Sequence, residues 1–470
     1  MFNILITLVR GKALAILIGP AGMGLNGLLL SGLNLIKTAS SLGIEQSAVR
    51  DISAAHASED KQRINRTFSV FRRWIWITAT LGVVLTIALS PLLSRFSFKS
   101  GEHTLSFVLL SSTFIFGALA GGIYTLLRGT RKIKSLAQAN IAGSIAGLVV
   151  ALPIFYLYGI KGVVPAIILT SFSGYLVSLF FRRKISFQKV ALSYRETMKE
   201  GGGMVKLGIS LSLSALMGTG VNYILYAFIT RSGSLTDVGL YSAGMTIVGT
   251  YVGMVFSAMG TDYFPRLSGV IHDEGKWKIL VNQQAEMVIL ILGPILAILL
   301  ATAPFLIRII LSAEFLPIID FLTWAVLGLL LKGVVWVMGF VLVAKGDNKV
   351  FLVTETIGSL YFLGLNIFLY HLYGIQGLGI SLFLGNLLSV IMLVTVLKLK
   401  YDFVFKFKFA VMVAVFFILL ATIIGSVIWL GFPNTYYSGL LISLISCCVS
   451  IFGLNERLGL RELICSFIKG

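Results

Sequence analysis

Charged residues and cysteine are both scarce in this sequence of 470 residues. Asp, Glu, Lys and Arg together make up 12% of the chain, and the three cysteines are Cys447, Cys448 and Cys465. An adjacent pair such as Cys447 and Cys448 does not easily form a bridge, and the three positions lack the spacing of metal ligands. We therefore expect neither a disulfide framework nor a metal site.

Acids are rarer than bases, with 19 Asp and Glu against 38 Lys and Arg. The acids that border apolar segments fall near segment ends, and none lies near the centre of the first half. They are Glu45, Asp51, Asp262, Glu286, Asp320, Asp347 and Glu355. A carboxylate site for a bound cation is therefore not expected in the first half. Asp262 and Arg266, one helical turn apart, are expected to form an ion pair.

Long apolar runs dominate the sequence. Hydrophobic residues make up 57% of the chain, and the mean hydropathy is +0.95. A helix that crosses the bilayer core needs about 20 mostly apolar residues. Such segments are residues 2–18, 22–44, 74–94, 105–127, 136–158, 162–181, 207–230, 238–262, 284–311, 317–343, 350–371, 377–397, 409–430 and 438–455. The sequence therefore predicts an all-α polytopic membrane protein with about 14 transmembrane helices.

Most basic residues fall on one predicted side of the membrane. With both chain ends inside, 29 of the 38 Lys and Arg residues lie in cytoplasmic connections or in the C-terminal tail. Membrane proteins carry such an excess in their cytoplasmic loops. This bias explains most of the net charge of +19, so we expect no nucleic-acid partner and two cytoplasmic termini.

The first half of the chain recurs in the second at an offset of 215 residues. The clearest match pairs residues 157–162 (LYGIKG) with residues 372–377 (LYGIQG). The same offset pairs Gly24 with Gly239. Because each copy holds six segments, the repeat predicts two six-helix lobes of the same topology.

The repeat also predicts the domain organisation. We expect an N-terminal lobe at residues 1–190, a C-terminal lobe at residues 191–400, and two further helices with a short tail at residues 401–470. The joint between the lobes, residues 182–206, is basic. Its Gly201-Gly202-Gly203 run is expected to act as a hinge.

Four basic side chains lie inside apolar segments, at Arg10, Lys12, Lys37 and Lys332. Placing Lys or Arg at the centre of a membrane helix costs roughly 2.5 to 3.5 kcal/mol, so such residues normally face a protein interior or a watery cavity. We predict that these four line a cavity that accepts an anion. Alternatively, Arg10 and Lys12 snorkel to an interface, and Lys332 is neutralised by Asp320 or by a carboxylate on another helix.

Two tryptophans share a helix face with Lys332. Asp320, Trp324, Gly328, Lys332 and Trp336 follow one another at intervals of four, so neighbours in this series lie on nearly the same face. The ammonium of Lys332 could rest against the ring of Trp336. We predict that Trp324 and Trp336 contact sugar or lipid.

Two acids are candidates for ion coupling, Glu355 and Asp320. Glu355 is the deepest candidate for a proton or sodium site. The alternative is a structural hydrogen bond from Glu355 to a neighbouring helix.

Other sequence patterns do not have the surroundings that a cofactor site or catalytic site requires. Residues 22–27 fit G-x-G-x-x-G but open an apolar segment and do not follow a strand, so we expect no dinucleotide cofactor. Gly117-x-x-x-Gly121 is typical of helix packing. The sequence has no phosphate-binding loop and no convergent set of nucleophile and base, so we expect no cofactor, no catalytic residues and no ATP-driven pump.

Several short motifs are left to explain, at residues 12–15 (KALA), 19–24 (GPAGMG), 264–268 (FPRLS), 314–315 (EF) and 344–345 (AK). At these motifs the chain resembles the multidrug/oligosaccharidyl-lipid/polysaccharide (MOP) exporter superfamily, and within it the Wzx-type flippases of O-antigen and related units. The resemblance implies two lobes that alternately open a central cavity, in the bacterial cytoplasmic membrane. It also implies a cargo, an undecaprenyl-pyrophosphate-linked oligosaccharide of lipopolysaccharide or related polysaccharide synthesis, moved to the outer leaflet.

The resemblance further implies partners and roles. Membrane lipids, a polysaccharide polymerase and assembly proteins are the expected partners. Arg10 and Lys37 look like the basic positions of lipid II flippases, which differ in cargo alone. An ion-coupled drug or metabolite antiporter is the main rival, and a membrane-embedded polymerase or glycosyltransferase is a weaker one, because such enzymes need a larger segment outside the membrane.

Overall fold

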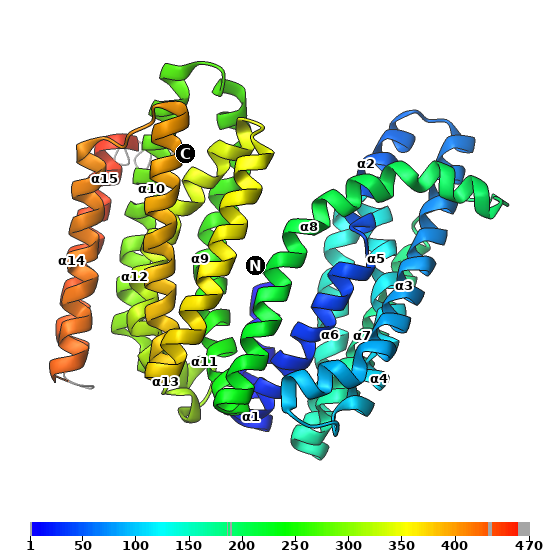
Figure 1. Cartoon of the computed structure of the whole chain (residues 1–470), viewed down its shortest axis with the longest axis horizontal. Coiled ribbons are helices and arrows are strands. Elements are labelled where there is room, and N and C mark those ends of the chain that lie inside the picture. The colour runs from blue at the N-terminus through cyan, green and yellow to red at the C-terminus, as the bar shows by residue number, and fades with distance from the viewer. Residues whose placement is uncertain (1, 186, 189, 431–434, 459–470) are drawn as a thin grey trace, which may run out of the picture. The chain divides into compact units, whose positions relative to one another are not determined.

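The structure, a computed structural model, describes residues 2–185, 187–188, 190–430 and 435–458. Helices, without a strand, make up its secondary structure over these ranges (Figure 1). The first group is α1 (Phe2–Ser40), α2 (Ile44–Ala57), α3 (Lys61–Phe98), α4 (Thr104–Leu110), α5 (Ser112–Gly129), α6 (Ile133–Tyr158), the 3₁₀ helix η1 (Gly159–Gly162), α7 (Val163–Arg182) and α8 (Tyr194–Ser232). The second group is α9 (Leu235–Val270), α10 (Glu274–Ala301), α11 (Ala303–Ile310), η2 (Ala313–Phe315), α12 (Ile318–Ala344), α13 (Asn348–Tyr401), α14 (Phe407–Leu430) and α15 (Thr435–Leu458).

The helices have the length and composition of membrane spans. Ten helical stretches of the described residues are long and apolar enough to cross a bilayer. A helix satisfies its own backbone hydrogen bonds, which a lipid environment requires because it offers no other partners. The all-α polytopic fold predicted from the sequence is confirmed, and the count of 14 spans stays a prediction.

The chain forms two compact units, Met1–Gly239 and Leu240–Gly470. In the N-terminal unit, α8 packs against α1, α2 and α3. In the C-terminal unit, α12 pairs with α13, and α10 packs against α12, α14 and α15. The finer division at residues 190/191 and 400/401 stays a prediction.

The backbone repeats its conformation at the clearest sequence match. Gly159 has φ 52° and ψ −132°, and Gly374 has φ 56° and ψ −135°. These positive φ angles favour glycine and break the apolar helices at equivalent points. Three residues later, Gly162 and Gly377 lie close to the carbonyl groups of residues 154 and 369, which are also 215 apart. The internal repeat is therefore visible in the backbone as well as in the sequence.

The first helix is also broken at a glycine. Gly19, with φ 62° and ψ −172°, separates two helical segments within α1, where the sequence predicts a joint. Helix α2 was not predicted. Its buried side chains Ile44, Ala48, Ile52 and Ala55 recur every three or four residues, and this spacing would have identified a helix.

The predicted hinge at residues 201–203 is wrong, because this run lies inside the continuous helix α8. The helix begins with a capping box, in which Ser193 and Glu196 each bond the backbone of the other. The glycine at position 201 makes room for a neighbour, since a Cβ there would overlap the indole nitrogen of Trp74. That indole donates to the carbonyl of Thr197 (3.3 Å) and joins α3 to α8.

The C-terminal unit contains several ion pairs. Asp262 and Arg266 pair at 3.0 Å, as predicted from their spacing. Glu286 on α10 pairs with Arg457 near the end of α15. Asp347, between α12 and α13, accepts hydrogen bonds from Lys400 and Tyr401 at the far end of α13.

Candidate functional site

A polar pocket of about 170 Å³ lies within the N-terminal unit, between α1, α2, α3, α5 and α7. Its wall combines apolar side chains with charged and polar ones. The charged and polar lining residues are Asn34, Lys37, Ser40, Ser41, Glu45, Thr78, Thr113 and Ser171. Below, this is called the Lys37 pocket.

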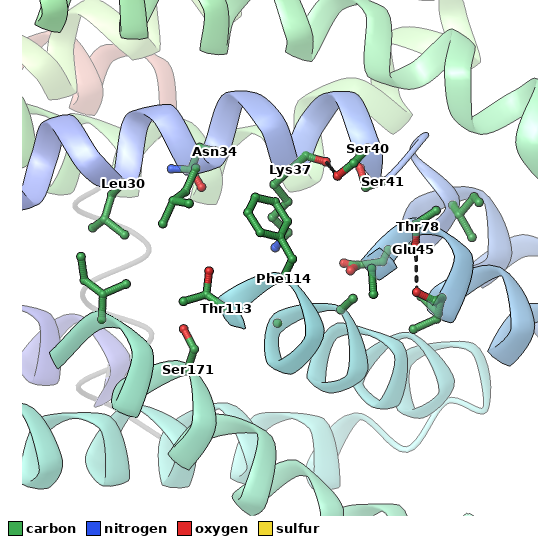
Figure 2. Close-up of a pocket in the computed structure, with 17 residues that line it drawn as sticks. Leu30, Asn34, Lys37, Ser40, Ser41, Glu45, Thr78, Thr113, Phe114 and Ser171 are labelled. Carbon is green, nitrogen blue, oxygen red and sulfur yellow. Dashed lines mark hydrogen bonds between the residues drawn. The ribbon is translucent and has the colours of Figure 1, made fainter. Parts of the chain in front are cut away.

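Lys37 reaches the pocket from the second segment of α1. Leu30, Asn34 and Lys37 recur every three or four residues along α1, so they lie on one face of the helix, and Ser41 follows directly after its end. Figure 2 shows Asn34 and Lys37 extending from α1, with Thr113 and Ser171 on the opposite side. The predicted cavity role of Lys37 is consistent with this position and stays a prediction.

Glu45 also lines the pocket, although the sequence predicts no carboxylate site in the first half. Gly43, with φ 61°, makes the turn after α1 and starts α2, so Glu45 in the first turn of α2 folds back beside the pocket. A carboxylate near the end of a membrane segment is thereby brought to the same pocket as Lys37.

The glycine pair of α5 makes space for this carboxylate. A Cβ at Gly121 would lie 2.5 Å from Oε1 of Glu45, and a Cβ at Gly117 would have no neighbour within 4 Å. Gly117 lines the pocket itself. The predicted helix packing applies to Gly121, where α5 lies against Glu45 of α2, whereas Gly117 borders the pocket.

The pocket contains a basic and an acidic side chain, Lys37 and Glu45, that do not pair with each other. Among the described residues, neither Lys37 nor Glu45 takes part in an ion pair. The hydroxyl and amide groups around them can donate and accept hydrogen bonds. Such a lining suits an anionic group at Lys37 and sugar hydroxyls at the remaining polar side chains.

Arg10 and Lys12 do not join Lys37. They lie on the first segment of α1, before the break at Gly19, and are not part of the Lys37 pocket. Both side chains are partly buried. Their roles stay predictions.

The remaining predicted residues belong to the C-terminal unit. Lys332 and Asp320 are exposed positions on α12, and Glu355 is exposed on α13. The indole nitrogen of Trp324 is buried and has no hydrogen-bond partner among the described residues. The predicted roles of these residues in binding and ion coupling stay predictions.

Trp336 belongs to an aromatic cluster. Its ring stacks on Phe256, with centroids 5.1 Å apart and planes at 10°, and it also contacts Tyr263 and Phe340. These contacts are with aromatic rings of α9 and α12, whereas the sequence pattern suggested Lys332 as its neighbour. The predicted sugar or lipid contact of Trp336 stays a prediction.

No group of three or more His, Cys, Asp and Glu side chains in the described part of the chain is placed to hold a metal ion. The two cysteines within that part, Cys447 and Cys448, are free thiols.

Comparison with known proteins identifies relatives in sequence. A family model described as "Polysaccharide biosynthesis protein" matches residues 13–320. The lipid III flippases of Escherichia coli (strain K12) and Shigella flexneri are each 21% identical over 359 residues, covering 74% of this chain and 83% of the relative.

Solved structures share the fold. A multidrug resistance MATE family transporter of the MOP superfamily, in an inward-facing conformation, aligns with a TM-score of 0.72 at 15% identity and covers 86% of this chain and 95% of its own. The lipid II flippase MurJ, in an inward closed conformation, aligns with a TM-score of 0.61 at 14% identity over 98% of this chain and 99% of its own. Since the family model spans well over half of the sequence, this chain belongs to the polysaccharide biosynthesis protein family, with the fold of MOP exporters.

Proposed function

We propose that this protein is a flippase that moves a lipid-linked oligosaccharide from the cytoplasmic to the outer leaflet by alternating access. The observation that carries the proposal is the Lys37 pocket, which combines a cation with hydroxyl and amide groups in a member of a polysaccharide biosynthesis family. A charged headgroup cannot cross a bilayer unaided, because leaving water is far too costly for an ion. Fixed polar groups inside the protein replace that water.

The cargo we propose is an undecaprenyl-pyrophosphate-linked repeat unit, of O-antigen or a related polysaccharide. Lys37 would hold a negative charge of the cargo, and the surrounding hydroxyls would bond its sugars. Arg10, Lys12 and Lys332 are proposed as further cationic contacts, and Trp324 and Trp336 as sugar or lipid contacts. A lipid II headgroup has the same kinds of groups, so a lipid II flippase remains an alternative that differs in cargo alone.

The cellular setting follows from this cargo. We propose the bacterial inner membrane, with both termini cytoplasmic, and a transport step without bond making or breaking. A polysaccharide polymerase and assembly proteins would receive the flipped unit.

A second candidate function is an ion-coupled antiporter for a drug or metabolite. The observation that favours it is Glu45, a carboxylate in the Lys37 pocket that could exchange a proton. Asp320 and Glu355 are proposed as alternative coupling acids.

The experiment that tests the flippase is the sidedness of lipid-linked oligosaccharide in cells, measured with an enzyme that modifies the glycan from outside. Lys37→Ala should trap the glycan inside, and Lys37→Arg should retain flipping. Lys161→Ala is the matched control, since Lys161 is exposed on η1 and lies outside the pocket. All variants are compared at equal protein level.

The outcome separates the two candidates. If removal of the whole protein leaves sidedness unchanged, the flippase proposal is wrong and the antiporter becomes the better candidate. If Lys37→Ala and Lys161→Ala behave alike while removal traps the glycan, the protein flips its cargo without Lys37.

A further inference from the structure

A second hollow lies in the N-terminal unit, between α3, α5 and α7. It has a volume of about 110 Å³ and an apolar floor. The floor side chains are Ile75, Leu119, Ile123, Leu126 and Leu179. It is called the α3–α5–α7 groove below.

Two arginines line this apolar groove. Arg72 comes from α3, and Arg182 is the last residue of α7. Both side chains lie in the described part of the chain, and neither takes part in an ion pair there. No acid is among the residues that line the groove, so its charge is uncompensated. Two cations without an acidic partner in an apolar groove suit a ligand that joins an anionic group to an apolar group.

The surroundings of the groove indicate where that anion comes from. Large apolar side chains beside it are exposed, with Trp76 at 45%, Leu176 at 49% and Phe180 at 61%. In a membrane protein such side chains face lipid, and tryptophan is enriched where the apolar core meets the headgroups. The same end of the unit carries the basic linker of residues 182–206. The groove therefore opens at the level where phospholipid headgroups lie.

We propose that the α3–α5–α7 groove binds an anionic phospholipid of the membrane. Arg72 and Arg182 hold its phosphate, and an acyl chain lies on the apolar floor. Basic pockets between membrane helices are suited to anionic headgroups in this way. Ile75 is only 4% exposed and lines both this groove and the Lys37 pocket, so the bound lipid supports a wall of that pocket. Lipid binding at this site is separate from cargo transport and can be measured without it.

The test uses the purified full chain in detergent and follows quenching of tryptophan fluorescence, to which Trp76 contributes from the groove. The probes are phosphatidylglycerol and phosphatidylcholine with brominated acyl chains. Wild type should bind phosphatidylglycerol more tightly than phosphatidylcholine. Arg72→Ala/Arg182→Ala should weaken phosphatidylglycerol binding roughly 30-fold, the order expected for two cations near an anionic headgroup, and leave phosphatidylcholine binding unchanged.

The control removes the same charge elsewhere. Lys134→Ala/Arg183→Ala takes away two exposed cations that do not line the groove, and it should bind phosphatidylglycerol like wild type. The proposal is overturned if both double variants lose affinity equally, or if wild type does not distinguish the two lipids. It is also overturned if a polyprenyl phosphate displaces the probe while unlabelled phosphatidylglycerol does not, since the groove then belongs to the polyprenyl chain.

Discussion

Gly24 and Gly239 pack backbone against backbone. A Cβ at Gly24 would overlap the carbonyl oxygen of Leu235, and a Cβ at Gly239 would overlap the carbonyl oxygen of Pro20. Pro20 and Leu235 are 215 residues apart, as are Gly24 and Gly239. The contact is therefore reciprocal between the two copies of the repeat, and glycine at both positions is required by the close approach.

Gly24→Ala should destabilise the protein. The new methyl group meets a backbone carbonyl, which cannot rotate away, so we expect a loss of about 1 to 3 kcal/mol from overpacking. The thermal midpoint of the purified protein in detergent measures this. Gly11→Ala, on the same helix with no atom within 4 Å of its Cβ, is the control and should be neutral or stabilising. Equal midpoints for the two variants would contradict the contact.

Gly201→Ala should also destabilise, because its Cβ would overlap the indole of Trp74, which is itself buried. We expect a net loss of about 1 to 3 kcal/mol in the free energy of unfolding. Gly202→Ala and Gly203→Ala have no neighbour within 4 Å and should gain up to about 1 kcal/mol from the better helix propensity of alanine. If the run acted as a flexible hinge, all three substitutions would reduce transport and none would reduce stability.

Gly121→Ala should impair transport more than stability. The added Cβ would lie 2.5 Å from Oε1 of Glu45, whose flexible side chain can move, so the fold tolerates the change while the carboxylate is displaced. Glycan sidedness measures transport, and the thermal midpoint measures stability. Glu45→Asp, with its shorter side chain, should restore transport to the Gly121→Ala variant. Failure of this rescue would show that the effect of Gly121→Ala does not come from displacement of the Glu45 carboxylate.

Asp347→Asn should lower the thermal midpoint at neutral pH. Hydrogen bonds from Lys400 and Tyr401 hold the pKa of the Asp347 carboxyl below its usual range. A carboxyl group whose pKa is lower in the folded than in the unfolded state stabilises the fold at pH values above its unfolded-state pKa, about 3.9. This stabilisation is lost as the pH falls through the folded-state pKa. The difference in thermal midpoint between wild type and Asp347→Asn should therefore be constant between about pH 6 and about pH 8, and it should shrink below about pH 4.

The control for Asp347 is Glu314→Gln, which removes an exposed carboxylate from the same unit. It should not change the midpoint at neutral pH. A difference between wild type and Asp347→Asn that persists unchanged at low pH would mean that the charge of Asp347 does not stabilise the fold.

Much of the fold could be predicted from local features of the sequence. Apolar runs of membrane length must form helices, because lipid offers no partner for a free backbone group. The break at Gly19 and the ion pair of Asp262 with Arg266 also follow from neighbours in the chain. Helix α2 carried a readable signal in its buried spacing, although it lies mostly between the predicted segments at residues 22–44 and 74–94.

The sequence by itself thus determined the membrane class, the apolar helical segments, the repeat and a cation in the second segment of α1. Tertiary structure alone decided that Glu45 shares a pocket with Lys37, that Gly201 lies against Trp74 and that Gly24 meets Gly239. The physical reason is that each of these relations depends on the turn or packing of helices, which spacing along one helix does not specify. Local hydrogen bonding and hydrophobicity select the helices, whereas side-chain volume and backbone approach select their neighbours.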